Sequence, residues 1–138
     1  MVLDTDVVVA AMRSPRGASA ELLRAARSGG IVLLVSVPLA IEYEAVCHEA
    51  EHRLAAGLSE YDADLLVTAV IAMAEAIEIR FLWRPQLRDP GDEMVLETAI
   101  NGAADALVTF NARDYGAAPT KFGIELLVPR DAIRRIRE

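Results

Sequence analysis

The sequence has 138 residues, of which 54% are hydrophobic, and 14 Lys and Arg against 21 Asp and Glu give a formal net charge of −7. This length suits a single domain over residues 1–138 with a sizeable core, and the apolar content excludes a disordered chain. The acidic balance argues against a dedicated binder of duplex DNA, which would present a basic surface. RNA remains open as a substrate, because a bound cation supplies local positive charge.

The single cysteine, Cys47, excludes both an intrachain disulfide and a cysteine-rich zinc site. No cationic and apolar leader is visible at the start of the sequence. The longest apolar runs, over residues 31–41 and 65–74, are shorter than the roughly 20 residues that a membrane span needs. We therefore expect a cytoplasmic protein.

Short apolar runs and turn signals divide the first part of the chain. Residues 1–3 form an apolar run that ends at Asp4, which indicates a short buried strand. The turn signal at 14–17 precedes apolar residues at helical spacing that stop at 29–30, so a helix is expected between them. The β-branched run 31–35 predicts the second strand.

Two helices are expected next. Ser36 is a candidate N-cap for a helix that reaches about Leu54. Ser59 and Asp62 come close to a capping box, which predicts another helix ending near Ala76.

The alternation of strands and helices continues to the end of the sequence. The later predictions are a strand over 77–83, a loop over 84–91, a helix over 92–101, a strand over 106–109, a loop over 110–123, a strand over 124–128 and a helix over 131–137. This order predicts an α/β fold, in which a central, mainly parallel sheet of about 4–5 strands lies between flanking helices.

Acidic and polar residues gather after the predicted strands, at the sheet edge where α/β folds place their ligands. They are Asp4, Thr5 and Asp6 after the first strand, Ser36 and Glu42 after the second, Asp92 at the start of a later helix, and Thr109, Asn111 and Asp114 after the strand 106–109. Carboxylates on one rim raise one another's pKa unless a partner neutralises them. Carboxylate and water oxygens select Mg²⁺ or Mn²⁺, which can activate water to attack a phosphodiester.

Each of these acids also has a plain structural interpretation. Asp4 and Asp114 could be turn formers, Asp92 could stabilise a helix N-terminus, and Glu42 could lie on a solvated helix face. Asp105 is left out of the site, because it precedes the end of its strand by roughly 13 Å.

The only histidines, His48 and His52, lie four residues apart, a spacing that can bind metal on a helix. No second motif accompanies them, so an exposed helix face is the simpler interpretation. Cys47 is interpreted as a small core residue.

Four motifs together resemble a PIN domain, and the resemblance covers essentially the whole chain. They are residues 1–6, Ser36 with Glu42 and Tyr43, residues 89–99, and residues 104–111. The branch they resemble contains toxin components of toxin–antitoxin systems related to VapC-type toxins. The resemblance implies a Mg²⁺- or Mn²⁺-dependent endoribonuclease that an antitoxin protein holds in check.

The resemblance carries the family's acidic residues over to Asp4, Glu42 and Asp92. Asn111 stands where the commonest pattern has an acid, so Asp114 is the candidate for the fourth position. Asp6 stands where the family usually has Asn, which adds a carboxylate beside Asp4.

The predicted roles follow from these positions. Asp4, Asp92 and Asp114 hold the metal directly or through water, and Glu42 orients the attacking water or binds a second ion. The supporting residues that hydrogen-bond to this group are Thr109 and Asn111, with Thr5 and Ser36 as weaker candidates.

Three arginines, Arg13, Arg16 and Arg113, lie in segments near the strand ends and are candidates for RNA phosphate contacts. An apolar stripe within 54–76 is a candidate for a homodimer or antitoxin interface, and a stripe that faces the core is the simpler alternative. The competing hypothesis is a catalytically weak or inactive PIN-like protein that acts through antitoxin binding or self-association. A phosphatase-like or DNA-repair nuclease with the same carboxylate rim is a third.

Overall fold

The computed structural model describes residues 1–82, 84 and 86–138. In chain order its elements are β1 (Val2–Leu3), α1 (Thr5–Arg13), α2 (Ala18–Arg27), β2 (Leu34–Val35), α3 (Val37–Cys47), α4 (Ala50–Ala55), α5 (Glu60–Ala72), β3 (Glu75–Ala76), α6 (Pro90–Asn101), β4 (Ala106–Val108), α7 (Ala112–Tyr115), α8 (Ala118–Lys121), β5 (Glu125–Leu127) and α9 (Pro129–Ile136). Among the helices in these residues, none combines the length and the apolar character needed to cross a bilayer.

The strands form two parallel sheets that meet between β1 and β2. In the three-stranded sheet β4 lies between β1 and β5, and Leu107 opposes Val2 on one side and Leu126 on the other. In the two-stranded sheet β2 pairs with β3. The Leu34 N–H donates to the Met1 carbonyl at 2.9 Å and links the two sheets. The predicted α/β fold with a mainly parallel sheet is confirmed.

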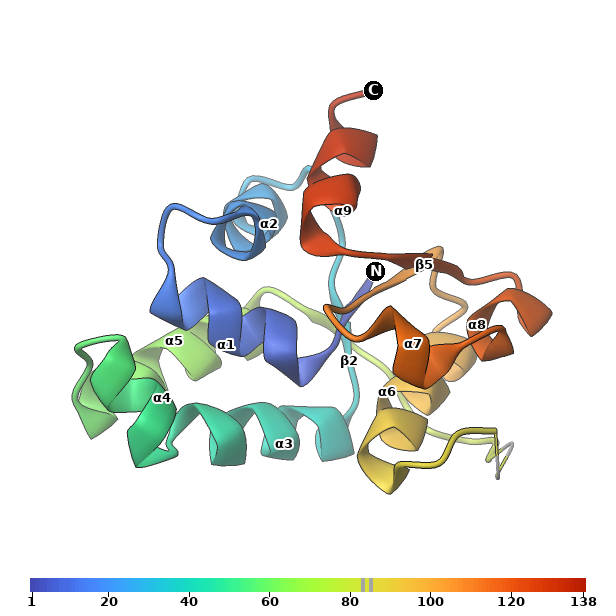
Figure 1. Ribbon diagram of the computed structural model, residues 1–138, viewed down its shortest axis with the longest axis horizontal. Helices are drawn as coiled ribbons and strands as arrows, with labels where there is room; N and C mark the ends of the chain where they lie inside the picture. The colour runs from blue at the N-terminus through green and yellow to red at the C-terminus, as the bar shows by residue number, and fades with distance from the viewer. Residues whose placement is uncertain (83, 85) are drawn as a thin grey trace.

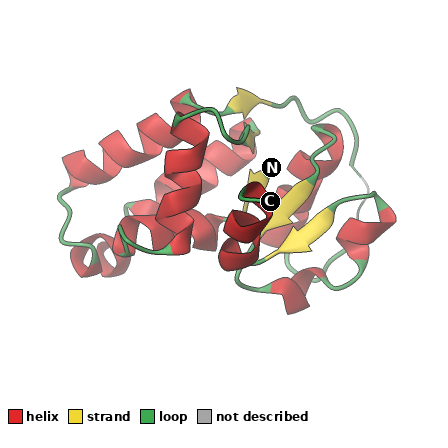
Figure 2. Cartoon of the chain, turned by 90° about the horizontal axis from the view of Figure 1, so that it is seen from above, coloured by secondary structure: helices red, strands yellow, loops and turns green. Residues whose placement is uncertain are grey.

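Helices cover the strands on both sides (Figures 1 and 2). In Figure 1, α1, α3, α4 and α5 lie on one side of β2, and α6, α7 and α8 lie on the other. The central strands β1 and β4 are apolar throughout and fully buried, as expected for strands covered on both faces.

A buried tyrosine joins α3 to the end of β1. The Tyr43 side chain is 2% exposed, and its hydroxyl donates to the Leu3 carbonyl, one residue before Asp4. Burial, followed by the charge of Asp4, raises the pKa of Tyr43, so the phenol stays protonated and remains a donor. This bond fixes α3 relative to the carboxyl end of β1.

The helix expected from Ser36 to about Leu54 is two helices. α3 ends at Cys47, and α4 begins at Ala50. His48 caps α3: its Nδ1 lies 2.7 Å from the Glu44 carbonyl, and its Nε2 lies 2.7 Å from Asp64 Oδ1 on α5. The hydrogen bond to Glu44, together with the Asp64 charge, raises the pKa of His48. The break is therefore held by contacts with α5.

The strand predicted over 77–83 was wrong in position for the residues that the structure describes; residue 83 lies outside them. α5 ends at Ala72, and the strand is β3, where the Glu75 N–H donates to the Leu33 carbonyl. The Ile77 N–H, directly after β3, donates to the Val35 carbonyl of β2. Further along, the Asn101 side chain accepts from the N–H groups of Arg80 and Phe81. A helix side chain thus replaces a neighbouring strand as the hydrogen-bond partner.

Three helices fall where none was expected. α1 contains three consecutive valines, residues 7–9, whose β-branched side chains have low helix propensity. Burial of these valines and the N-cap Asp4 stabilise the helix. The short helices α7 and α8 lie in the predicted loop 110–123.

The Tyr43 bond can be tested by Tyr43→Phe, which removes the donor to the Leu3 carbonyl and changes little else. We expect the free energy of unfolding to fall by about 1 kcal/mol, measured by denaturant titration. Tyr61→Phe is the matched control, because Tyr61 is 69% exposed and should change stability by less than about 0.5 kcal/mol. Equal stability of Tyr43→Phe and the wild type would contradict this role.

Candidate active site

The carboxylate of Asp4 lies at the centre of the site, between β1 and α1. It is the N-cap of α1 and only 7% exposed. Its Oδ1 accepts from the Thr5 N–H at 2.7 Å, and its Oδ2 accepts from Thr109 Oγ1 at 2.8 Å and from the Tyr115 hydroxyl at 3.0 Å. A carboxylate has about four lone-pair positions, so three donors leave it able to bind a cation as well.

Asp6 faces Asn111 beside this centre. Asp6 Oδ2 accepts from Asn111 Nδ2 at 2.8 Å and from the Phe110 N–H at 3.2 Å. Its other oxygen, Oδ1, is buried and has no hydrogen-bond partner among the described residues. Burial, followed by the charge of Asp4, raises the pKa of Asp6 to about 6. A buried carboxylate oxygen without a partner is unfavourable, and a bound cation or a proton would relieve that cost.

Thr109 ties the segment after β4 to both acids. It is fully buried, and its hydroxyl accepts from the Asn111 N–H at 3.0 Å. The hydroxyl proton goes to Asp4, since Asp6 lies farther away at 3.5 Å. The turn that carries Asn111 is therefore fixed against the end of β1.

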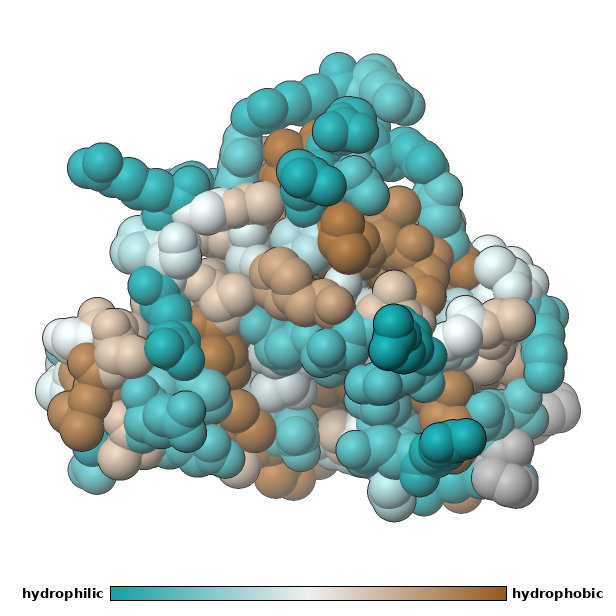
Figure 3. Space-filling view, in the orientation of Figure 1, coloured by the Kyte–Doolittle hydropathy of each residue, from teal (hydrophilic) through white to brown (hydrophobic). Residues whose placement is uncertain are grey.

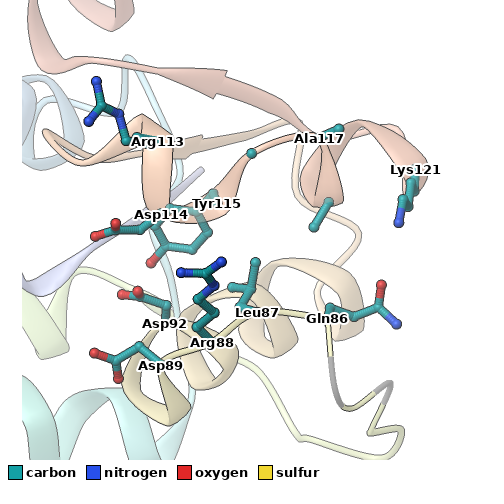
Figure 4. Close-up of a pocket in the computed structure, with 12 residues that line it drawn as sticks. Gln86, Leu87, Arg88, Asp89, Asp92, Arg113, Asp114, Tyr115, Ala117 and Lys121 are labelled. Carbon is teal, nitrogen blue, oxygen red and sulfur yellow. The ribbon is translucent and has the colours of Figure 1, made fainter.

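Asp92 contributes a further carboxylate from the first turn of α6, which Asp89 caps through the Gly91 N–H. Its pKa is raised to about 6 by burial and by the charges of Asp4, Asp89 and Asp114. The carboxylates of Asp4 and Asp114 therefore lie close enough to Asp92 for their charges to affect its ionisation. Figure 4 shows Asp92 and Asp114 on either side of the Tyr115 hydroxyl.

An open cavity of about 860 Å³ borders these acids (Figure 4). Asp89, Asp92, Asp114 and Tyr115 line it, together with three cationic side chains, Arg88, Arg113 and Lys121. In Figure 4 the Arg88 side chain points into the cavity from the loop before α6. The cavity thus combines carboxylates with cations that can attract a phosphate.

The remaining polar residues predicted for the site lie around it. Ser36 is buried and bonds Thr98 through the two hydroxyls at 2.7 Å, while capping α3 through the Leu39 N–H. Thr5 is buried and donates its backbone N–H to Asp4. Glu42 is half-buried on α3, where the described part of the chain offers it no hydrogen bond or ion pair.

Of the three candidate RNA-binding arginines, the structure places only Arg113 in the wall of the cavity. Arg13 lies at the far end of α1, roughly 13 Å along the helix from Asp4, and its Nη1 lies 3.2 Å from His52 Nδ1. Arg16 is exposed in the turn before α2.

Sequence reasoning missed Tyr115, Arg88 and Lys121, and it missed a row of polar residues on α6. Glu93 Oε1 accepts from the N–H groups of Gln86 and Leu87, both at 2.6 Å. Glu97 forms a two-point ion pair with Arg84 at 2.7 and 3.0 Å, and Asn101 holds residues 80–81. The spacing of four residues between these three side chains was the available signal, because it puts them on one face of the helix.

The donor set suits a hard divalent cation. No three acidic, His or Cys side chains in residues 1–82, 84 and 86–138 converge on a single ion position. Mg²⁺ does not need such a cage, since proteins commonly bind it through one or two carboxylates, water and substrate phosphate. The unpartnered oxygen of Asp6, the remaining lone pair of Asp4 and the crowded charge of Asp92 fit that mode.

The raised pKa values of Asp6 and Asp92 predict a pH dependence of stability. Both acids hold a proton more tightly in the folded protein than in the unfolded chain, so their contribution to folding falls as pH rises from about 4 to about 6. We expect the protein in EDTA to melt at a higher temperature near pH 5 than near pH 7.5. Asp92→Asn should reduce that difference, whereas Asp105→Asn, an exposed acid at the other end of β4, should not. A melting temperature that increases over this range would contradict the assignment.

Comparison with known proteins assigns the chain to a family. A family model of the PIN domain matches residues 1–113, a range that contains Asp4, Asp6, Asp92 and Asn111 and ends just before Asp114. No curated protein matches the chain. Because the match spans far more than half of the sequence, this chain belongs to the PIN domain family.

Proposed function

We propose that this protein is a cytoplasmic endoribonuclease that depends on Mg²⁺ or Mn²⁺ and is the toxin of a toxin–antitoxin pair. PIN domains are generally nucleases, and they generally use divalent metals. The observation that supports the proposal most strongly is the contact of Asp4 and Asp6 with Thr109 and Asn111 at the carboxyl ends of β1 and β4. Asp92 on α6 is close enough for the charge of Asp4 to raise its pKa, and it lines a cavity with cationic walls.

In this proposal Asp4 and Asp92 are direct ligands of the ion. Asp6 and Asp114 bind the ion either directly or through a water molecule. The ion, when bound, supplies Lewis-acid stabilisation of the phosphate and activation of the attacking water. Glu42 orients that water or takes part in binding a second ion. Tyr115 keeps the Asp4 carboxylate in place, and burial raises its pKa, so it remains a donor.

Asp6 and Asn111 together account for the two departures from the family pattern. The carboxylate expected near position 111 is supplied by Asp6, and the amide expected at position 6 is supplied by Asn111, 2.8 Å away. The exchange leaves one carboxylate and one amide side by side. It therefore supports an active nuclease over the inactive alternative.

RNA is the proposed substrate, and Arg88, Arg113 and Lys121 are the groups that we assign to its phosphates. They place three positive charges around the cavity of a protein whose net charge is −7. Local positive charge of this kind is needed where the overall charge repels a polyanion.

The toxin role requires a protein partner, and exposed apolar side chains on neighbouring helices support one. Val37 and Ile41 on α3, Leu54 on α4, and Tyr61 and Leu65 on α5 are between 52% and 72% exposed. Large apolar side chains that gather on a surface mark protein interfaces. We propose that an antitoxin or a second copy of this chain covers them.

The nuclease proposal is tested by cleavage of single-stranded RNA with Mn²⁺, Mg²⁺ or EDTA. We expect cleavage with either metal, none in EDTA, and a fall of at least about 100-fold in rate for Asp4→Asn and Asp92→Asn, because each removes a charge from the cation site. Asp105→Asn, purified in the same way, should cut like the wild type.

A contaminating ribonuclease would survive in the Asp4→Asn and Asp92→Asn preparations, so equal cutting by these variants would overturn the proposal. A wild type that cuts no RNA with either metal would do so too. The protein would then be assigned to antitoxin binding or self-association.

The exchange between positions 6 and 111 has its own test in Mn²⁺ binding measured by titration calorimetry. Asp6→Asn should weaken binding about 10- to 100-fold, since it removes a carboxylate near the ion. Asn111→Asp in the same chain should restore affinity to within about threefold of the wild type, because it returns one carboxylate and one amide to the pair. A double variant that binds no better than Asp6→Asn would show that the two positions are not equivalent.

A further inference from the structure

Phe110 is an exposed aromatic residue attached to the acidic site. Its backbone N–H donates to Asp6 Oδ2 at 3.2 Å, and the preceding residue, Thr109, donates to Asp4. The Phe110 side chain is nevertheless 52% exposed. Its backbone is thus fixed beside the carboxylates while a large part of its ring remains available to a ligand.

The ring borders a second pocket, of about 390 Å³, that is separate from the cavity beside Asp92. The other walls come from the end of α1, the start of α2 and the start of α9, and include Gly17, Val128 and Pro129. Figure 3 shows hydrophobic residues gathered on this face where β5 leads into α9. Mostly apolar pockets of this size with a few polar groups are typical of small-molecule and base binding.

Two polar groups at this pocket have no partner among the described residues. Ser19 lines it and is 3% exposed, and the described residues provide no hydrogen-bond partner for its Oγ. A buried hydroxyl without a partner is unfavourable unless water or a ligand satisfies it. Arg130 also lines the pocket, and no acidic side chain in the described segments forms an ion pair with it. A suitable ligand would have a planar apolar face for the Phe110 ring, a polar edge for the Ser19 hydroxyl and a negative charge for Arg130.

We propose that this pocket binds one base of single-stranded RNA, stacked on Phe110, with the adjoining phosphate at Arg130. The inference rests on the proposed function, because it places the nucleotide next to the one that is cleaved. Aromatic side chains and arginine are the groups on which proteins stack and hold the bases of single-stranded RNA. The bond between the Phe110 N–H and Asp6 then sets the distance from the bound base to the acidic site.

The test measures binding of labelled single-stranded RNA by fluorescence anisotropy in EDTA, so that no cleavage occurs. We expect Phe110→Ala to weaken binding about 5- to 100-fold, the loss of one stacked base, and Phe110→Tyr to bind like the wild type. Val32→Ala is the control, because Val32 is 57% exposed and precedes the amino end of β2, whereas Phe110 follows the carboxyl end of β4. Unchanged binding by Phe110→Ala would overturn the inference.

A set of oligonucleotides, each with one abasic position, identifies the base. One position should weaken wild-type binding as much as Phe110→Ala does, and Phe110→Ala should lose nothing further on that oligonucleotide. A loss by Phe110→Ala that is the same at every abasic position would show that Phe110 stacks on no particular base and would overturn the inference.

The outcomes for the two proposals remain distinguishable. Binding that depends on Phe110, in a wild type that cuts no RNA with Mn²⁺, would support the base pocket and overturn the nuclease. Cleavage that depends on Asp4 and Asp92, with binding indifferent to Phe110, would do the reverse.

Discussion

The burial of one negative charge, on Asp4, organises this protein. The carboxylate lies almost out of solvent and depends on donors from Thr5, Thr109 and Tyr115, which belong to α1, to the turn after β4 and to α7. A buried charge is strongly unfavourable without such donors, so the segments that carry them must come together for the chain to fold. The same requirement brings Asp6, Asp92 and the turn at Asn111 to one place. Folding of the chain and assembly of the acidic site therefore depend on the same contacts of Asp4.

Asp6 and Asn111 are interpreted differently when each is compared with the family pattern alone and when the two are considered as neighbours in the fold. Taken singly, each residue departs from the pattern expected of the family, and each would suggest a damaged site. In the folded chain the two side chains are hydrogen-bonded partners, and in the proposed function they supply one carboxylate and one amide side by side. When two neighbouring positions exchange a carboxylate and an amide, the pair can keep both groups in place even though each position, taken alone, has changed.

Much of the fold could be predicted from the sequence because its signals are local. The capping box of Ser59 and Asp62 marks the start of α5, and Gly102 marks the end of α6. The errors arose where distant contacts decide the outcome. The valines of α1 have low helix propensity but are buried, His48 ends α3 while contacting Asp64, and Asn101 takes the N–H groups of a segment whose sequence resembles a strand. Asp4 and Asp6 could be proposed for the site because they follow a strand, but Tyr115 could not, because the acid that it contacts, Asp4, is distant in sequence.

The row of Glu93, Glu97 and Asn101 on α6 has a consequence for how the wall of the cavity can change during evolution. Glu93 and Asn101 accept from backbone N–H groups, which nearly every amino acid possesses, and only Glu97 requires a particular partner, Arg84. Glu93 thus holds the backbone of residues 86–87, directly before Arg88, through groups that a substitution of their side chains does not remove. Gln86, Leu87 and Arg88 line the cavity, so substitutions at these positions can alter what the cavity recognises while the bonds to Glu93 keep the backbone in place.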